Sequence, residues 1–84
     1  METITTMLYA DALKRDLVRY HDTVDNVAAE RIKNRMVDTV DDALGHQGDS
    51  VNIVETIMML PDGMNSDDLV AQIAKIVWPE AIVS

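Results

Sequence analysis

Glycine and proline are absent from the first 44 residues of this 84-residue chain. All five residues of these two types come later, and they are Gly45, Gly48, Pro61, Gly63 and Pro79. Because glycine and proline disfavour helix interiors more than other residues do, the sequence predicts a long helical first part and a shorter second part divided by turns. The short length predicts a single domain over residues 1–84.

The spacing of apolar residues divides the first part into two helices. One stripe has steps of three and four residues and consists of Tyr9, Leu13, Leu17, Tyr20, Val24 and Val27. A second stripe begins one position over and consists of Ala28, Ile32, Met36, Val40 and Ala43. This change of face predicts helices over about 4–20 and about 23–44, with Asp22 or Thr23 as the N-cap of the second. A single bent helix of about forty residues is the alternative.

Two further helices are predicted after Gly45, which can end a helix by taking a positive φ. The first covers about 50–60 with Asp49 or Ser50 as its N-cap. It is apolar around most of its circumference, so we expect it to be the most buried element, with Ile57 and Leu60 in the core.

The last predicted helix covers about 66–78, with Asn65 or Ser66 as its N-cap. Asp67 and Asp68 would lie in its first turn, where the helix dipole favours carboxylates. No segment shows the alternating pattern of a strand. The predicted fold class is therefore all-α, a small bundle of three to four helices.

Charge is distributed unevenly along the chain. Residues 1–35 hold six acidic and six basic residues, whereas residues 36–84 hold nine acidic residues and one basic residue, so the formal net charge of −8 belongs to the second part. Such a field attracts basic proteins and repels phosphate backbones and anionic lipids. We therefore expect a protein partner with a basic surface, without direct binding of nucleic acid or membranes. The candidate partner-binding residues are Asp38, Asp41, Asp42, Asp49, Asp62, Asp67 and Asp68.

A basic patch could form from Lys14, Arg15, Arg19, Arg31 and Arg35, but we expect the acidic residues between them in the sequence to neutralise it.

Apolar residues make up 48% of the chain, which is more than so short a chain can readily hide, so we expect a homodimer or another homo-oligomer. The absence of cysteine excludes disulfides. No apolar run reaches the ~18 residues that span a bilayer, and the N-terminus lacks the pattern of a signal peptide. These features predict a soluble, cytoplasmic protein.

Motifs for catalysis and metal binding are weak. Asp38, Asp42 and His46 are spaced four apart and could hold a divalent cation on a continuous helix. Gly45 is expected to break that helix, so we interpret the acidic residues as a solvated face. Ser50 and Ser66 lack a nucleophile motif and are interpreted as helix caps. The sequence therefore predicts no enzyme activity, no metal site and no cofactor.

Two segments resemble known families. Residues 49–60 resemble the start of the second helix of acyl carrier proteins, through Asp49, Ser50, Val54, Glu55, Met58 and Leu60. This resemblance implies that Ser50 carries phosphopantetheine. Residues 30–40, followed by Ala43, Leu44 and Gly45, resemble the second helix of the 2-methylcitrate dehydratase family, and Arg19 and Tyr20 resemble the end of its first helix. The second resemblance, over about 19–45, implies helix packing and not dehydratase activity.

The function predicted from these patterns is that of a small acidic, non-enzymatic protein-interaction module. We expect it to self-associate and to regulate or inhibit a basic partner, such as a nucleic-acid-binding protein. The alternative is an acyl or peptidyl carrier-like domain that uses Ser50.

Overall fold

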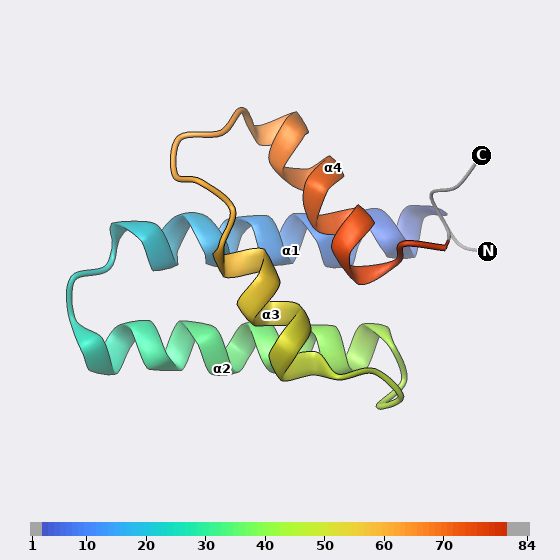
Figure 1. Ribbon diagram of the computed structural model, residues 1–84, viewed down its shortest axis with the longest axis horizontal. Helices are drawn as coiled ribbons and strands as arrows, with labels where there is room; N and C mark the ends of the chain where they lie inside the picture. Colours follow the sequence, from blue (N-terminus) through green and yellow to red (C-terminus); the bar gives the residue numbers. More distant parts are fainter. Residues whose placement is uncertain (1–2, 81–84) are drawn as a thin grey trace.

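The computed structural model describes residues 3–80, with side chains from Met7 onward. Figure 1 shows four helices, which are α1 (Thr3–Asp22), α2 (Asn26–Ala43), α3 (Ser50–Met58) and α4 (Ser66–Val77). Residues 3–80 contain no strand, so the all-α prediction is confirmed.

Helices α1 and α2 lie antiparallel and form one layer, and the two shorter helices pack on it (Figure 1). Helix α4 packs on α1, α3 packs on α2, and α3 and α4 also contact each other. The core lies between this layer and the shorter helices. Its buried side chains are Ala10, Leu13, Leu17, Met36, Val40, Val54, Ile57, Leu69, Ile73, Ala74 and Val77.

The first two helices are separate, so the alternative of a single bent helix is wrong. The Thr23 hydroxyl donates to the carbonyl of Arg19 (2.6 Å) at the end of α1. The carboxylate of Asp25 accepts from the backbone N–H of Ala28 (3.0 Å) and is the N-cap of α2. The predicted caps, Asp22 and Thr23, are therefore wrong by two or three positions, because the loop continues as far as Asp25.

The predicted apolar stripe is buried only within α1 and not beyond the end of that helix. Leu13 and Leu17 are fully buried, whereas Val24 is 99% exposed and Val27 is also exposed. Val24 lies in the loop and Val27 in the first turn of α2, so helical spacing carried across the loop does not predict their burial.

The turn after α2 has the predicted positive φ at Gly45 (63°), and the next residue, His46, has φ 64°. Asp49 and Asn65 are the N-caps of α3 and α4, each one of the two residues predicted for that position. Two successive residues in the left-handed region turn the chain sharply from α2 towards α3.

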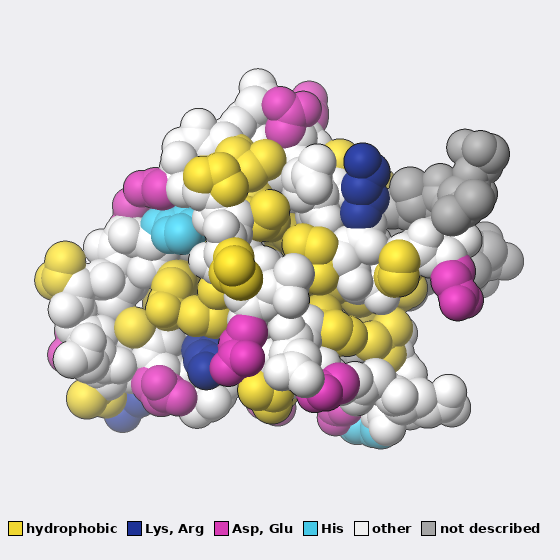
Figure 2. Space-filling model, viewed as in Figure 1, with side chains coloured by type: hydrophobic (Ala, Val, Ile, Leu, Met, Phe, Trp, Pro, Cys, Tyr) yellow, Lys and Arg dark blue, Asp and Glu magenta, His cyan; other side chains and the backbone are white. Residues whose placement is uncertain are grey.

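Among the residues with described side chains, helix α3 shares with α4 the largest proportion of buried residues, with three of its nine residues buried compared with four of twelve in α4. Helix α3 ends at Met58, so Leu60 lies beyond it and is only half-buried, while Ile57 is fully buried as predicted. Val51 and Met59 are exposed, because α3 packs on its neighbours with one side only and leaves the other in solvent. Figure 2 views the molecule from the side on which α3 and α4 lie, and it shows hydrophobic side chains at this surface.

Within the part of the chain that the structure describes, no helix is both long enough and apolar enough to cross a membrane.

Candidate functional site

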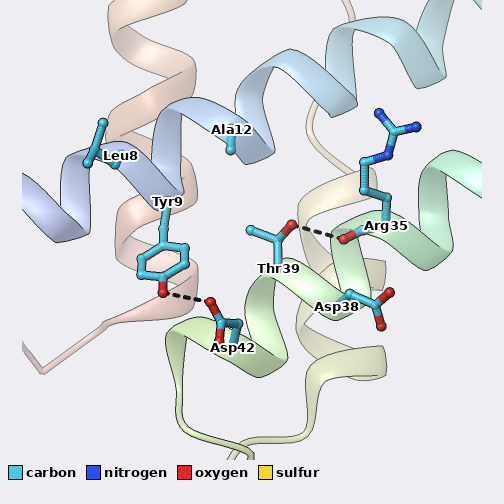
Figure 3. A pocket seen from close by; sticks show the side chains of 7 residues that line it. All are labelled: Leu8, Tyr9, Ala12, Arg35, Asp38, Thr39 and Asp42. Carbon is cyan, nitrogen blue, oxygen red and sulfur yellow. Dashed lines mark hydrogen bonds between the residues drawn. The ribbon is translucent and has the colours of Figure 1, made fainter.

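An open groove of about 540 Å³ lies between the first half of α1 and the second half of α2 (Figure 3). Helix α1 contributes Leu8, Tyr9 and Ala12, and α2 contributes Arg35, Asp38, Thr39 and Asp42. The antiparallel packing of the two helices brings together residues that lie far apart in the sequence. A smaller groove of about 390 Å³ lies between α1 and α4, with Asp67 on its lining.

The α1 side of the larger groove is apolar. Leu8 is 66% exposed, and Ala12 is also exposed. These residues are four apart on one helix, so their side chains lie on the same face one turn apart. They offer a small apolar surface that no part of the described chain covers.

The α2 side of the groove is acidic. Asp38 and Asp42 are four apart on α2 and both are exposed. Asp42 accepts a hydrogen bond from the Tyr9 hydroxyl (2.8 Å), which ties the start of α1 to the end of α2. This hydrogen bond raises the pKa of Tyr9 above its ordinary value, and partial loss of hydration and the charge of Asp42 add to the effect.

The basic side chain in the groove is held by its own chain. Arg35 Nη1 lies 3.7 Å from Asp16 Oδ1, and Asp16 is a buried carboxylate on α1. Because an unpaired buried carboxylate is costly, this ion pair fixes Arg35 at one end of the groove. Arg35 therefore does not neutralise the carboxylates of Asp38 and Asp42.

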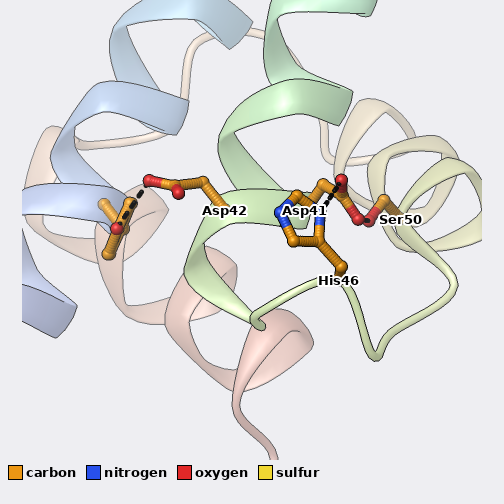
Figure 4. A network of polar contacts seen from close by, with 5 residues as sticks. Asp41, Asp42, His46 and Ser50 are labelled. Carbon is orange, nitrogen blue, oxygen red and sulfur yellow. Dashed lines mark hydrogen bonds and ion pairs between the residues drawn. The ribbon is translucent and has the colours of Figure 1, made fainter.

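A second polar cluster lies where α2 meets α3 (Figure 4). Asp41 contacts His46 Nδ1 with one carboxylate oxygen and accepts a 3.3 Å hydrogen bond from the Ser50 hydroxyl with the other. His46 thus pairs with Asp41 and does not join Asp38 and Asp42 in the possible metal ladder. Among residues 3–80, no three acidic, histidine or cysteine side chains are placed to hold a metal ion.

Ser50 is buried, with only 7% of its surface exposed, at the first position of α3. Its hydroxyl faces Asp41 (Figure 4), so an attached phosphopantetheine arm would first have to break this contact and open the α2–α3 packing. In this geometry Ser50 has a structural role, as the link between two helix ends.

The seven predicted partner-binding aspartates do not form one surface. Asp38 and Asp42 line the groove, and Asp41 and Asp49 flank the α2–α3 turn. The other three lie between α3 and α4 or in the first turn of α4, and they are Asp62, Asp67 and Asp68. Figure 1 shows the start of α4 at the upper edge of the molecule and the end of α2 at the lower right. The aspartates at the start of α4 therefore belong to a different part of the surface from those at the end of α2.

The sequence reasoning missed the α1 side of the groove. Leu8 and Ala12 lie outside the predicted buried stripe, and Tyr9 was assigned to that stripe and not to a contact with Asp42, 33 residues away. The available signal was the pair of exposed apolar positions four apart on the polar face of the first helix.

No protein-family model, no curated protein and no solved structure matches this chain. The resemblances to acyl carrier proteins and to the 2-methylcitrate dehydratase family therefore stay hypotheses that rest on the quoted residues.

Proposed function

We propose that this chain is a non-enzymatic protein-interaction module that binds a basic protein through the groove between α1 and α2, and so regulates or inhibits that protein. The observation that carries the proposal is the composition of the groove, which is apolar on the α1 side and acidic on the α2 side. Lysine and arginine have the matching form, since each has an apolar stem and a cationic head. A basic side chain can lay its stem on Leu8 and Ala12 and direct its charge to Asp38 or Asp42.

The position of the acidic residues on α2 strengthens this proposal. Asp42 lies in the last turn of α2, where the helix dipole places partial negative charge. The last turn of α2 contains no basic residue to offset it. Negative charge of the dipole and of the carboxylates therefore adds up at one end of the groove, which favours a cationic ligand.

Charge reversal of Asp38 tests the proposal. Asp38 is exposed and lines the groove. Asp41 contacts the Ser50 hydroxyl and His46, so reversing the charge of Asp41 would disturb the fold as well as the surface. Asp38→Lys is compared with Asp62→Lys, which makes the same change of charge in an exposed turn away from the groove. Immobilised wild type and both variants are used to capture proteins from a lysate of the native host, and the captured proteins are quantified by mass spectrometry.

We expect basic proteins that the wild type and Asp62→Lys capture and Asp38→Lys does not. Their association rates with purified wild type should fall as salt rises, because electrostatic attraction is screened within about 8–10 Å at ordinary ionic strength. Equal capture by Asp38→Lys and Asp62→Lys, or capture of no basic protein by the wild type, would contradict the proposal.

The carrier alternative requires that Ser50 become accessible. Incubation with a phosphopantetheinyl transferase and coenzyme A, followed by mass spectrometry of the intact protein, tests it directly. A mass gain that is lost in Ser50→Ala would support a carrier, and the burial of Ser50 leads us to expect no gain.

A further inference from the structure

The outer face of the α1–α2 layer carries two parallel rows of exposed side chains, one on each helix. The row on α1 consists of Leu8, Ala12, Arg15 and Arg19. The row on α2 consists of Arg31, Arg35, Asp38 and Asp42. Steps of three and four keep each row on one side of its helix, and the buried residues of both helices lie at other angles. We call this surface the outer face.

The outer face is basic at one end and acidic and apolar at the other. All four arginines of the chain lie in its two rows, on the side of the α1–α2 loop, and Arg35 borders the groove, whose acidic residues Asp38 and Asp42 lie farther from the loop. Arg15 pairs with Asp11 (2.7 Å) and Arg35 with Asp16 (3.7 Å).

Arg19 and Arg31 form no ion pair with any residue of the described part. The expected neutralisation of the basic patch therefore holds for Lys14, Arg15 and Arg35, which pair with Asp11 or Asp16, and not for Arg19 and Arg31. Two exposed guanidinium groups remain available at the basic end.

We propose that a second copy of this chain binds to the outer face, related by a two-fold axis that lies in the interface and runs across the two helices. Such an axis places the acidic end of each copy on the basic end of the other. The residue pairs repeat on both sides of the axis, as a closed symmetric interface requires.

The spacing of the α2 row fits this arrangement. With α2 antiparallel to α2 of the second copy and the axis between Met36 and Val37, Asp42 lies opposite Arg31 and Asp38 lies opposite Arg35. Both acid–base pairs form at one register, because the acidic residues and the arginines are each four apart. Two copies therefore bring four opposite-charge pairs together along α2.

The spacing of the α1 row fits the same axis. With the axis between Leu13 and Lys14, Arg19 of one copy lies over Leu8 of the other, so its apolar stem can cover that exposed leucine. Within one copy, the contacts Tyr9–Asp42 and Asp16–Arg35 define the register of α1 against α2. That register places the two axis positions within about one residue, or about 1.5 Å, of each other along the helices. One axis thus serves both rows.

The dimer should be weak and sensitive to salt. The rows extend over about 17 Å along helices about 10 Å wide, so the interface is smaller than the roughly 800 Å² per partner of a stable complex. The dimer and the proposed function share one surface, since arginines of the second copy would use the groove proposed for a basic partner. Self-association and partner binding would then exclude each other.

The pair Arg31–Asp42 allows a charge-swap experiment. Arg31→Glu and Asp42→Lys each place like charges opposite each other twice in the dimer, whereas the double variant restores both pairs in reverse. The dissociation constant of the dimer is measured by sedimentation equilibrium from about 10 μM to about 1 mM protein. Circular dichroism confirms the fold of each variant, and Asp62→Lys is the control for net charge.

We expect the wild type to dimerise, each single variant to raise the dissociation constant at least about tenfold, and the double variant to return to within about threefold of the wild type. Asp42→Lys and Asp62→Lys both reduce the net charge of −8, so simple repulsion between copies predicts stronger association for both. Weaker association of Asp42→Lys together with unchanged or stronger association of Asp62→Lys would show that the position of Asp42 matters, and not only the net charge.

Three outcomes would overturn the inference. They are a monomeric wild type over the whole range, single variants that dimerise like the wild type, and a double variant that stays as weak as the single variants. None of these outcomes affects the proposed function, which is tested by capture with Asp38→Lys. Conversely, unchanged capture by Asp38→Lys together with a successful charge swap would contradict the proposed function and leave the dimer in place.

Discussion

The α1–α2 layer has an inner and an outer face that share one helical spacing and differ in chemistry. The inner face consists of fully buried apolar residues, which include Leu13, Leu17, Met36 and Val40. The outer face is exposed and carries all four arginines together with Asp38 and Asp42. The inner face stabilises the fold, and the proposed recognition uses the outer face. Substitutions on the two faces should therefore separate loss of folding from loss of binding.

The largest effect is expected on the inner face. Leu17→Ala removes a fully buried side chain and should lower the free energy of unfolding by about 2–5 kcal/mol. Its neighbour Val18 is 44% exposed, so Val18→Ala should cost less than about 1 kcal/mol. Urea unfolding followed by circular dichroism measures both. Similar losses for the two variants would show that the assignment of inner and outer faces is wrong.

An intermediate effect is expected where the two faces meet. Arg35→Ala leaves the buried carboxylate of Asp16 without its cation and should lower the free energy of unfolding by about 1–3 kcal/mol. Arg31 lies one turn away in the same row and has no ion pair in the described residues, so Arg31→Ala should change it by less than about 0.5 kcal/mol. Thermal unfolding of the two variants is measured at low and at high salt. Equal unfolding midpoints for Arg35→Ala and Arg31→Ala would show that Arg35 has no special role in stability.

The smallest effect concerns Tyr9 at high pH. Its hydrogen bond to Asp42 raises the pKa of Tyr9, so the neutral hydroxyl is favoured in the folded protein. The resulting stabilisation should be complete below the unfolded pKa of about 10 and should be lost as the pH rises through the folded pKa. Unfolding is measured between about pH 8 and about pH 11.5 for the wild type and Tyr9→Phe. A constant difference between the two proteins over this range would contradict the prediction.

The number of helices and their approximate positions could be predicted because each depends on local features. Gly45 ends α2 by its own backbone conformation, and Asp49 and Asn65 were among the predicted caps. The start of α2 could not be fixed in the same way. Asp22, Thr23 and Asp25 can each accept from a free N–H, and cap energies of about 1 kcal/mol differ too little between them to decide.

The exposed side of α3 and the groove could not be predicted, since both depend on which helices become neighbours. An apolar circumference predicts burial only if neighbours surround the helix, and α3 packs on its neighbours with one side. Asp38 and Asp42 were predicted as partner-binding residues from charge alone. Leu8 and Ala12 come to face them only through the antiparallel packing of α1 on α2, which no local pattern specifies.

The packing of α4 on α1 has a consequence for how the chain folds. These helices are separated by more than forty residues, whereas α1 and α2 are joined by three. Because closing a long loop costs more entropy, we expect the α1–α2 hairpin to form first and α4 to dock late. Ile73→Ala in α4 should then accelerate unfolding more than it slows folding. During that delay the apolar face of the hairpin is open to solvent, so the partly folded chain is prone to aggregate until α4 covers it.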